Sequence, residues 1–352
     1  MRGGAEAYIV LPVSSTIVTP VDERPDAEAG LWSAWAGDGR PLLAAGSLAL
    51  VAAGVFAWFL AATNQLLPHD LDWLTISEAE LRAVADGRLV HFMSHDRGAF
   101  GGTLVSIGVL YLWLIRFPLG AGQPWAWWIL AGSAGVGFLT FLSYLATGYL
   151  DSWHGLATLA ILPLFAIGLW RTRGAAARGP RHLTRLGLRG LILPPPATSD
   201  RELVGRSLLL LTGFGMLVAG LTIVTIGSLV VFVPQDLEFI GLSRAELSAI
   251  DPRLVPLVAH DRAGFGGALA TTGLVVVAIV RFADPTRALW QALAIAGGAG
   301  FGAAVGVHGL VGYLDGTHVG PAILAATLFA AGMVLWRPRT PTVKGLGRAA
   351  IR

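Results

Sequence analysis

The stretch that decides the fold is residues 207–233, SLLLLTGFGMLVAGLTIVTIGSLVVFV, which contains no charged side chain. A helix of about 20 mostly apolar residues spans the hydrocarbon core of a bilayer. Further runs of this kind lie at 41–63, 98–115, 124–147, 154–170, 263–280, 288–311 and 318–336. The sequence therefore predicts an all-α polytopic membrane protein with eight transmembrane helices.

The composition of the whole chain agrees with this fold class and excludes several functions. Of its 352 residues, 54% are hydrophobic and 13% are charged, with a mean hydropathy of +0.66, which is unlike a soluble globular protein. The absence of cysteine excludes disulfides, thiolate metal sites and iron–sulfur clusters. The single lysine, Lys344, lies in the polar tail, so a retinal Schiff base inside a membrane helix is excluded.

The distribution of arginine predicts the orientation in the membrane. Arginines gather in the segment 171–206 and after residue 336, and the positive-inside rule places both in the cytoplasm. The acid-rich segments 64–97 and 234–262 then lie outside, and both termini are cytoplasmic. We expect a multi-pass protein of a bacterial-type plasma membrane, with the lipid bilayer as a partner. This placement also accounts for the pI of about 9.7, so no nucleic-acid partner is expected.

Within the basic linker, Arg181, Arg185 and Arg189 recur at every fourth residue. This spacing is typical of a basic helix that lies on anionic headgroups. A solvated tether would show the same arginines, and the sequence leaves both interpretations open.

The two halves of the chain repeat each other. HDRGAFGG at 95–102 recurs as HDRAGFGG at 260–267, and GYLDSWH at 148–154 recurs as GYLDGTH at 312–318. We interpret this as a duplicated four-helix unit, whose copies share one orientation because each has an even number of spans. The expected organisation is a cytoplasmic tail 1–40, a first repeat 41–173 with external cap 64–97, a linker 174–206, a second repeat 207–339 with external cap 234–262, and a tail 340–352.

Each external segment carries a capping box, Ser77 with Glu80 and Ser243 with Glu246. Such a pair begins a helix through reciprocal side-chain and backbone hydrogen bonds. We therefore expect a short helix in each cap, serving either as a lid or as a folded connection between spans. Glycine pairs at 101–102 and 266–267 follow the polar motif and predict close helix packing.

Histidines and aspartates of the repeated motifs are candidate metal ligands. Their types suit zinc, manganese or iron, and the Asp-x-x-His spacing places both side chains on one helical face. The candidates are His95, Asp151 and His154 in the first half and His260, Asp315 and His318 in the second. A divalent metal is thus the one cofactor that the sequence suggests.

The neighbouring charged residues are candidate ligand-binding residues. Three consecutive helical residues point about 100° apart, so His95 is expected to face Asp151 and His154 while Arg97 pairs with Asp70 or Asp96. The candidates are Arg97, Asp96 and Asp70, with Arg262, Asp261 and Asp236 in the second half. The halves also differ, since His69 is matched by Gln235, His91 by Pro256 and Tyr144 by His308.

Three functions remain open. The first is a binding or accessory protein whose clusters hold the caps and bind a small-molecule or lipid ligand. The second is a metal-assisted enzyme acting on a lipid or small molecule at the outer leaflet, with Arg97 holding an anionic group. The third is a small-molecule transporter, which the lack of a charged residue in the middle of any predicted span disfavours. A purely structural ion-pair network would use the same residues.

Overall fold

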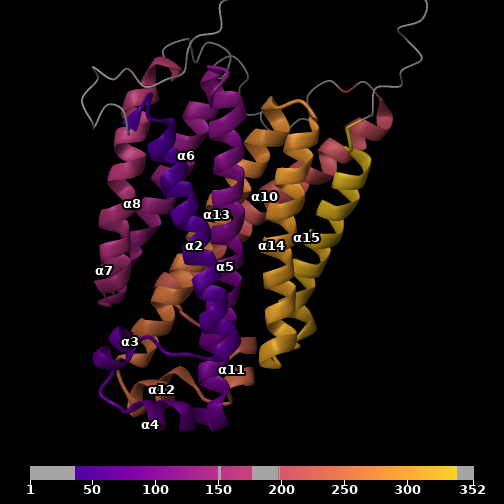
Figure 1. Cartoon of the computed structure of the whole chain (residues 1–352). Coiled ribbons are helices and arrows are strands. Elements are labelled where there is room, and N and C mark those ends of the chain that lie inside the picture. Colours follow the sequence, from indigo (N-terminus) through magenta and orange to yellow (C-terminus); the bar gives the residue numbers. More distant parts are fainter. Residues whose placement is uncertain (1–35, 150–151, 177–196, 198, 339–352) are drawn as a thin grey trace, which may run out of the picture.

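The structure is a computed structural model that describes residues 36–149, 152–176, 197 and 199–338, and every regular element in these residues is helical. Eight of the described helices are long and apolar enough to cross a membrane, as the sequence predicts. They are α2 (Arg40–Thr63), α5 (Arg88–Leu114), α6 (Pro124–Phe141), α8 (Ser152–Arg171), α10 (Asp200–Leu229), α13 (Leu254–Phe282), α14 (Arg287–Val311) and α15 (Gly316–Leu335) (Figure 1). The linker segment 181–193 lies outside the described residues.

Two helices, α5 and α13, form the centre of the bundle. Of the most apolar window of each, 78% is buried inside the protein, against at most 28% in any of the other six spans. They pack against each other, and the remaining helices surround them (Figure 1). Because the outer helices have no protein on their far side, their exposed apolar residues are available to lipid.

Helices from the two halves of the chain exchange partners around this centre. The third span of the first half, α6, packs against α13, and the third span of the second half, α14, packs against α5. The first spans stay with their own halves, α2 against α5 and α10 against α13. Any site on the central helices is therefore built from both halves. That the two halves are copies of one four-helix unit with a shared orientation stays a prediction.

The predicted close packing at the glycine pairs is confirmed. A Cβ at Gly101 would lie 2.7 Å from the carbonyl oxygen of Gly54 in α2, and one at Gly102 would lie 2.6 Å from the Cβ of Ala303 in α14. The pair thus admits two neighbouring helices on adjacent sides of α5, because glycine lets backbones approach closely.

Replacing Gly266 by leucine should weaken the bundle. A Cβ there would lie 2.6 Å from the backbone nitrogen of Val224, so the side chain must displace α10. Overpacking of this kind costs about 1–3 kcal/mol, measurable as a lower free energy of SDS-induced unfolding. Gly298→Leu is the control, since no atom lies within 4 Å of its Cβ position. Equal losses in the two variants would contradict this account.

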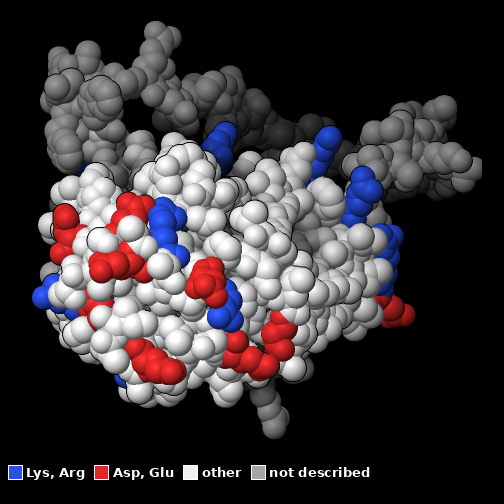
Figure 2. All heavy atoms as spheres, turned by 90° about the horizontal axis from the view of Figure 1, so that it is seen from below, with Lys and Arg blue, Asp and Glu red and all other residues white. Residues whose placement is uncertain are grey.

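Both caps are helical, and both capping boxes are present. Helices α3 (Pro68–Trp73) and α4 (Glu78–Ala83) connect α2 to α5, and α11 (Pro234–Ile240) and α12 (Arg244–Ile250) connect α10 to α13. The four lie at one end of the molecule, which we name the cap end, and Figure 2 shows acidic side chains spread over that face. The opposite end, where the chain enters the linker, is the linker end.

The caps of the two halves bind each other. Asp251, which is fully buried, accepts hydrogen bonds from the backbone nitrogen of Thr75 at 2.6 Å and from its hydroxyl at 2.9 Å. Burial acts to raise the pKa of Asp251, but hydrogen bonds from the backbone of Arg253 and from Thr75 outweigh it and lower the pKa below its usual value. The ionised carboxylate therefore fastens one cap to the other.

Candidate functional site

The repeated His-Asp-Arg residues lie inside the central helices, which corrects the predicted span boundaries. Helix α5 begins at Arg88 and α13 at Leu254, so His95 and His260 lie about two turns inside their helices rather than at the entrance to a span. Asp96 is 2% exposed and Arg262 is 6% exposed. These charges are tolerated in the bundle because each finds an opposite charge on another element.

Arg97 pairs with carboxylates from both halves. Its Nη2 donates to Asp70 Oδ2 at 2.6 Å, and its Nε donates to Asp261 Oδ2 at 3.0 Å. The predicted contact with Asp70 is thus present, whereas Asp96 is not a partner of Arg97. Because two carboxylates already occupy Nε and Nη2, the geometry gives little support to Arg97 as a clamp for an anionic ligand.

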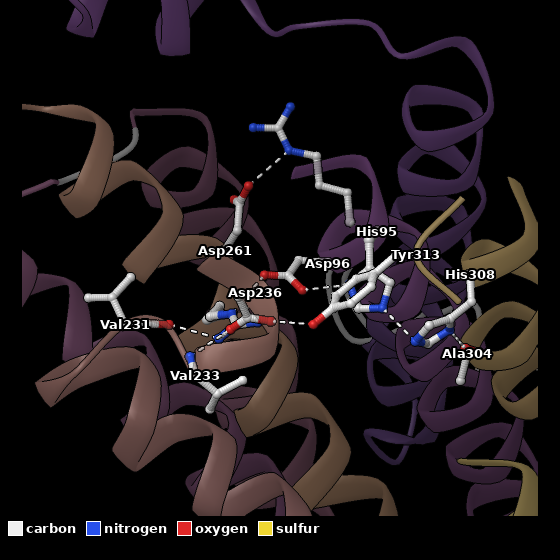
Figure 3. A network of polar contacts seen from close by, with 11 residues as sticks. His95, Asp96, Val231, Val233, Asp236, Asp261, Ala304, His308 and Tyr313 are labelled. Atoms are coloured by element: carbon white, nitrogen blue, oxygen red, sulfur yellow. Dashed lines mark hydrogen bonds and ion pairs between the residues drawn. The ribbon is translucent and has the colours of Figure 1, made fainter. Parts of the chain in front are cut away.

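Arg262 makes the corresponding contacts in the opposite direction. Its Nη1 donates to Asp236 Oδ2 at 2.6 Å, and its Nε donates to Asp96 Oδ2 at 3.2 Å. Each arginine therefore binds one aspartate from its own cap and one from the central helix of the other half. All six predicted ligand-binding residues belong to this network, shown in part in Figure 3.

Two tyrosines complete the network, and the sequence interpretation missed them. Tyr149 donates to Asp70 Oδ1 at 2.7 Å, and Tyr313 donates to Asp236 Oδ1 at 3.0 Å. Both belong to the repeated GYLD motif, so their recurrence was the available signal, but the motif's aspartate drew the interpretation instead. Burial, and after it the negative charge of Asp236, raises the pKa of Tyr313 above its usual value, so its hydroxyl stays a donor.

The network carries more negative than positive charge. Four carboxylates, at Asp70, Asp96, Asp236 and Asp261, face the two guanidinium groups, and each of these carboxylates is at most 10% exposed. Uncompensated charge is costly to bury. A cation bound close to the carboxylates would offset this excess.

Three histidines meet beside Asp96. His95 on α5 lies with His308 on α14 and His318 on α15, and one ring nitrogen of each lies within 4.8 Å of the others. His95 Nε2 is 3.1 Å from His308 Nε2, and both residues are buried, at 4% and 5% exposure. Two of the three imidazoles come from the second half and one from the first, so the partner exchange of α5 and α14 creates the cluster.

Hydrogen bonds at the far side of the rings fix which nitrogens carry a proton. His308 Nδ1 is 2.7 Å from the carbonyl oxygen of Ala304, and His95 Nδ1 is 3.0 Å from Asp96 Oδ1 (Figure 3). A carbonyl can only accept, and Asp96 accepts from Arg262 as a carboxylate, so both Nδ1 atoms are the donors. In neutral imidazoles the two Nε2 atoms then present lone pairs to each other.

A bound cation would remove this opposition of lone pairs. Zinc bonds to imidazole are about 2.0–2.1 Å long, so two nitrogens of a tetrahedral site lie about 3.3 Å apart, close to the separation of His95 and His308. Metal-bound histidines also donate their other ring nitrogen to a carboxylate or a backbone carbonyl, which is the pattern of these two residues. An extra proton would bridge two imidazoles, but it gives no reason for the third at His318.

The structure tests the predicted metal ligands only in part. His95 contacts His308 of the other half, whereas Asp151 and the side chain of His154 lie outside the described part of the structure. His260 has its ring centroid 4.9 Å from that of Tyr149. Of the predicted set, the structure brings together His95 and His318, and it adds His308.

Asp315 serves as a helix cap rather than as a ligand of this cluster. Its Oδ1 accepts from the Thr317 hydroxyl at 2.6 Å and from the His318 backbone nitrogen at 2.8 Å. The hydrogen bond from the Thr317 hydroxyl lowers the pKa of Asp315, and the hydrogen bond from the backbone of His318 lowers it further. The carboxylate thus holds the first turn of α15, where His318 lies.

His308 could have been found from one difference between the halves. Histidine stands at 308 where the first half has Tyr144, so the second half alone offers this extra ligand. Nothing in the sequence connects His308 with His95, which is 213 residues away.

Comparison with known proteins adds no family to this picture: no family model, no curated protein and no solved structure matches the chain.

Proposed function

We propose that this protein is a membrane metalloprotein that binds one divalent metal through His95, His308 and His318. The observation that carries the proposal is the pair of Nε2 atoms facing each other at 3.1 Å, with both opposite nitrogens committed as donors. Neutral imidazoles suit zinc, iron or copper better than manganese, which prefers oxygen. The excess of buried carboxylates, with Asp96 in contact with His95, favours a cation at this place.

The donor set also favours one of the three function classes. Three histidines leave a fourth coordination position open, as in catalytic zinc sites, whereas structural zinc sites are closed by four protein ligands. We therefore propose metal-assisted chemistry on a small molecule or lipid as the role of the site. Transport remains less supported, because the charged residues of the His-Asp-Arg motifs lie in the cap-side half of α5 and α13 and are paired with one another.

For the orientation, we propose that the cap end faces the exterior of a bacterial-type plasma membrane and that both termini are cytoplasmic. Acidic side chains on the cap face (Figure 2) and arginines near the linker end, such as Arg171, Arg173 and Arg337, support this. The metal site would then receive its ion and substrate from outside the cell.

Metal analysis of the purified full chain tests the proposal. After exposure to Zn²⁺ and removal of free ion, we expect one zinc per chain by elemental mass spectrometry. His308→Ala and His318→Ala should each remove most of it, because a three-ligand site loses its chelating geometry. His308→Tyr, which introduces the residue of the first half, provides a second test if the alanine variant does not fold.

The control is His91→Ala, which removes a histidine one turn before His95 that is not part of the cluster. This variant should keep its zinc. A folded wild-type protein that retains no zinc, iron or copper would overturn the proposal, as would undiminished zinc in both the His308 and His318 variants.

A further inference from the structure

A narrow cavity of about 490 Å³ lies between α2, α5, α6, α8 and α13. Its size falls within the range of small-molecule sites, roughly 300–1,000 Å³. Along α5 it is lined by Arg97, Phe100, Leu104, Ile107 and Tyr111, which share one face of the helix. At 1.5 Å per residue these span about 21 Å, so the cavity is long enough for an extended hydrocarbon chain.

The body of the cavity is apolar, and some of its lining side chains are exposed at the surface of the bundle. Phe138 and Ile161 line it from α6 and α8, and Phe56 of α2 and Trp153 of α8 line it too. Phe56 is 53% exposed and Trp153 is 64% exposed. Apolar residues so exposed on membrane-spanning helices contact acyl chains, so part of the cavity lining is in reach of a molecule dissolved in the bilayer.

One end of the cavity is polar and rich in hydrogen-bond acceptors. Asp70, Asp96 and Asp261 line this end, together with Arg97, His69 and His260. Arg97 Nε and Nη2 are already donated to Asp261 and Asp70. Carboxylates accept hydrogen bonds and cannot donate them when ionised, so this end suits a head group that donates hydrogen bonds and repels an anionic one.

We infer that the cavity binds a single-chain membrane amphiphile whose head group is a hydroxyl or an amine, with the head against Asp70 and Asp261 and the chain directed along α5 toward Tyr111. The inference does not require a metal at the three histidines. The ligand would contact Asp70 and Asp261, which are not part of the cluster of three histidines.

Gly137 makes the inference testable. It lines the cavity from α6, and the nearest atom to a Cβ there is Thr271 Oγ1, at 3.6 Å. The second half carries Phe301 at the matching position of α14. Gly137→Phe therefore introduces the side chain that the second half carries at this position. Its ring should project into the cavity and block part of it.

The experiment uses photoreactive probes on the full chain in lipid nanodiscs. Three probes share a dodecyl chain with a terminal diazirine and differ only in the head, which is an amine, a hydroxyl or a carboxylate. We expect the amine and hydroxyl probes to label peptides that contain Phe138 and Ile161 at least about tenfold more than the carboxylate probe, because like charges at a buried contact cost several kcal/mol. Unlabelled dodecanol should compete.

Gly137→Phe should remove this labelling, whereas Gly298→Phe, on an open face of α14, should keep it. Stronger labelling by the carboxylate probe would overturn the inferred head group. Labelling that survives Gly137→Phe or does not saturate would overturn the site itself and indicate general contact with lipid. Metal content is measured on the same samples, so failure here is separable from failure of the metal proposal.

Discussion

Arg97→Met should lower the free energy of unfolding by about 3–5 kcal/mol, the cost of removing one partner from a buried ion pair. The guanidinium binds Asp70 at 2.6 Å and Asp261 at 3.0 Å. Asp70 is 2% exposed, so removal of its partner leaves a poorly hydrated charge. Unfolding by SDS in mixed micelles, followed by tryptophan fluorescence, measures the loss.

Two further variants separate charge from shape. In the triple variant Arg97→Met/Asp70→Asn/Asp261→Asn, the uncompensated carboxylates are removed, and most of the lost stability should return. Arg82→Met breaks the exposed pair with Glu78 and an exposed hydrogen bond to the carbonyl oxygen of Asn64, and it should cost about 0–1 kcal/mol. If Arg97→Met and Arg82→Met cost the same, the network does not hold the bundle as we describe.

Zinc at a thousandfold excess over its dissociation constant should stabilise the wild-type chain by about 4 kcal/mol, since a ligand that binds the folded state alone shifts the unfolding equilibrium by mass action. The ion would link α5 to α14 and α15, which are distant from α5 in sequence but meet it at the three histidines. The shift is read as a rise in the midpoint of thermal unfolding, and a chelator should reverse it.

Two comparisons make this result specific. His308→Ala should lose the stabilisation by zinc, and magnesium should not stabilise the wild type, because imidazole is a poor ligand for magnesium. A zinc effect that is unchanged in His308→Ala would place the ion elsewhere on the protein.

The spans could be predicted from the sequence because their cause is local. A bilayer requires about 20 apolar residues in a row with all backbone groups hydrogen-bonded internally, so composition and length identify each helix. The capping boxes are equally local, since Ser77 and Glu80 lie three residues apart. The starts of α5 at Arg88 and of α13 at Leu254 were missed. The predicted spans begin only at residues 98 and 263, after the His-Asp-Arg motifs, because the sequence does not show that distant partners neutralise the charges of these motifs.

The candidate site was only partly predictable. Of the two partners predicted for Arg97, Asp70 is confirmed and Asp96 is not, since opposite charges alone do not choose between two nearby carboxylates. The contact between His95 and His308 was not predicted. It depends on α14 packing against the central helix of the other half, and nothing in the residues next to either histidine specifies that neighbour.

What the sequence by itself determined is the set of eight spans, the capped connections and the kinds of side chain available for chemistry. The tertiary structure alone decided that the halves exchange their third spans, that Arg97 and Arg262 each join both halves, and that three histidines meet. The physical reason is the distance along the chain over which each interaction acts. Hydrophobic length and capping act within a helix, whereas helix pairing in lipid is set by the fit of small-residue faces such as Gly102 against Ala303, which join segments far apart in the chain.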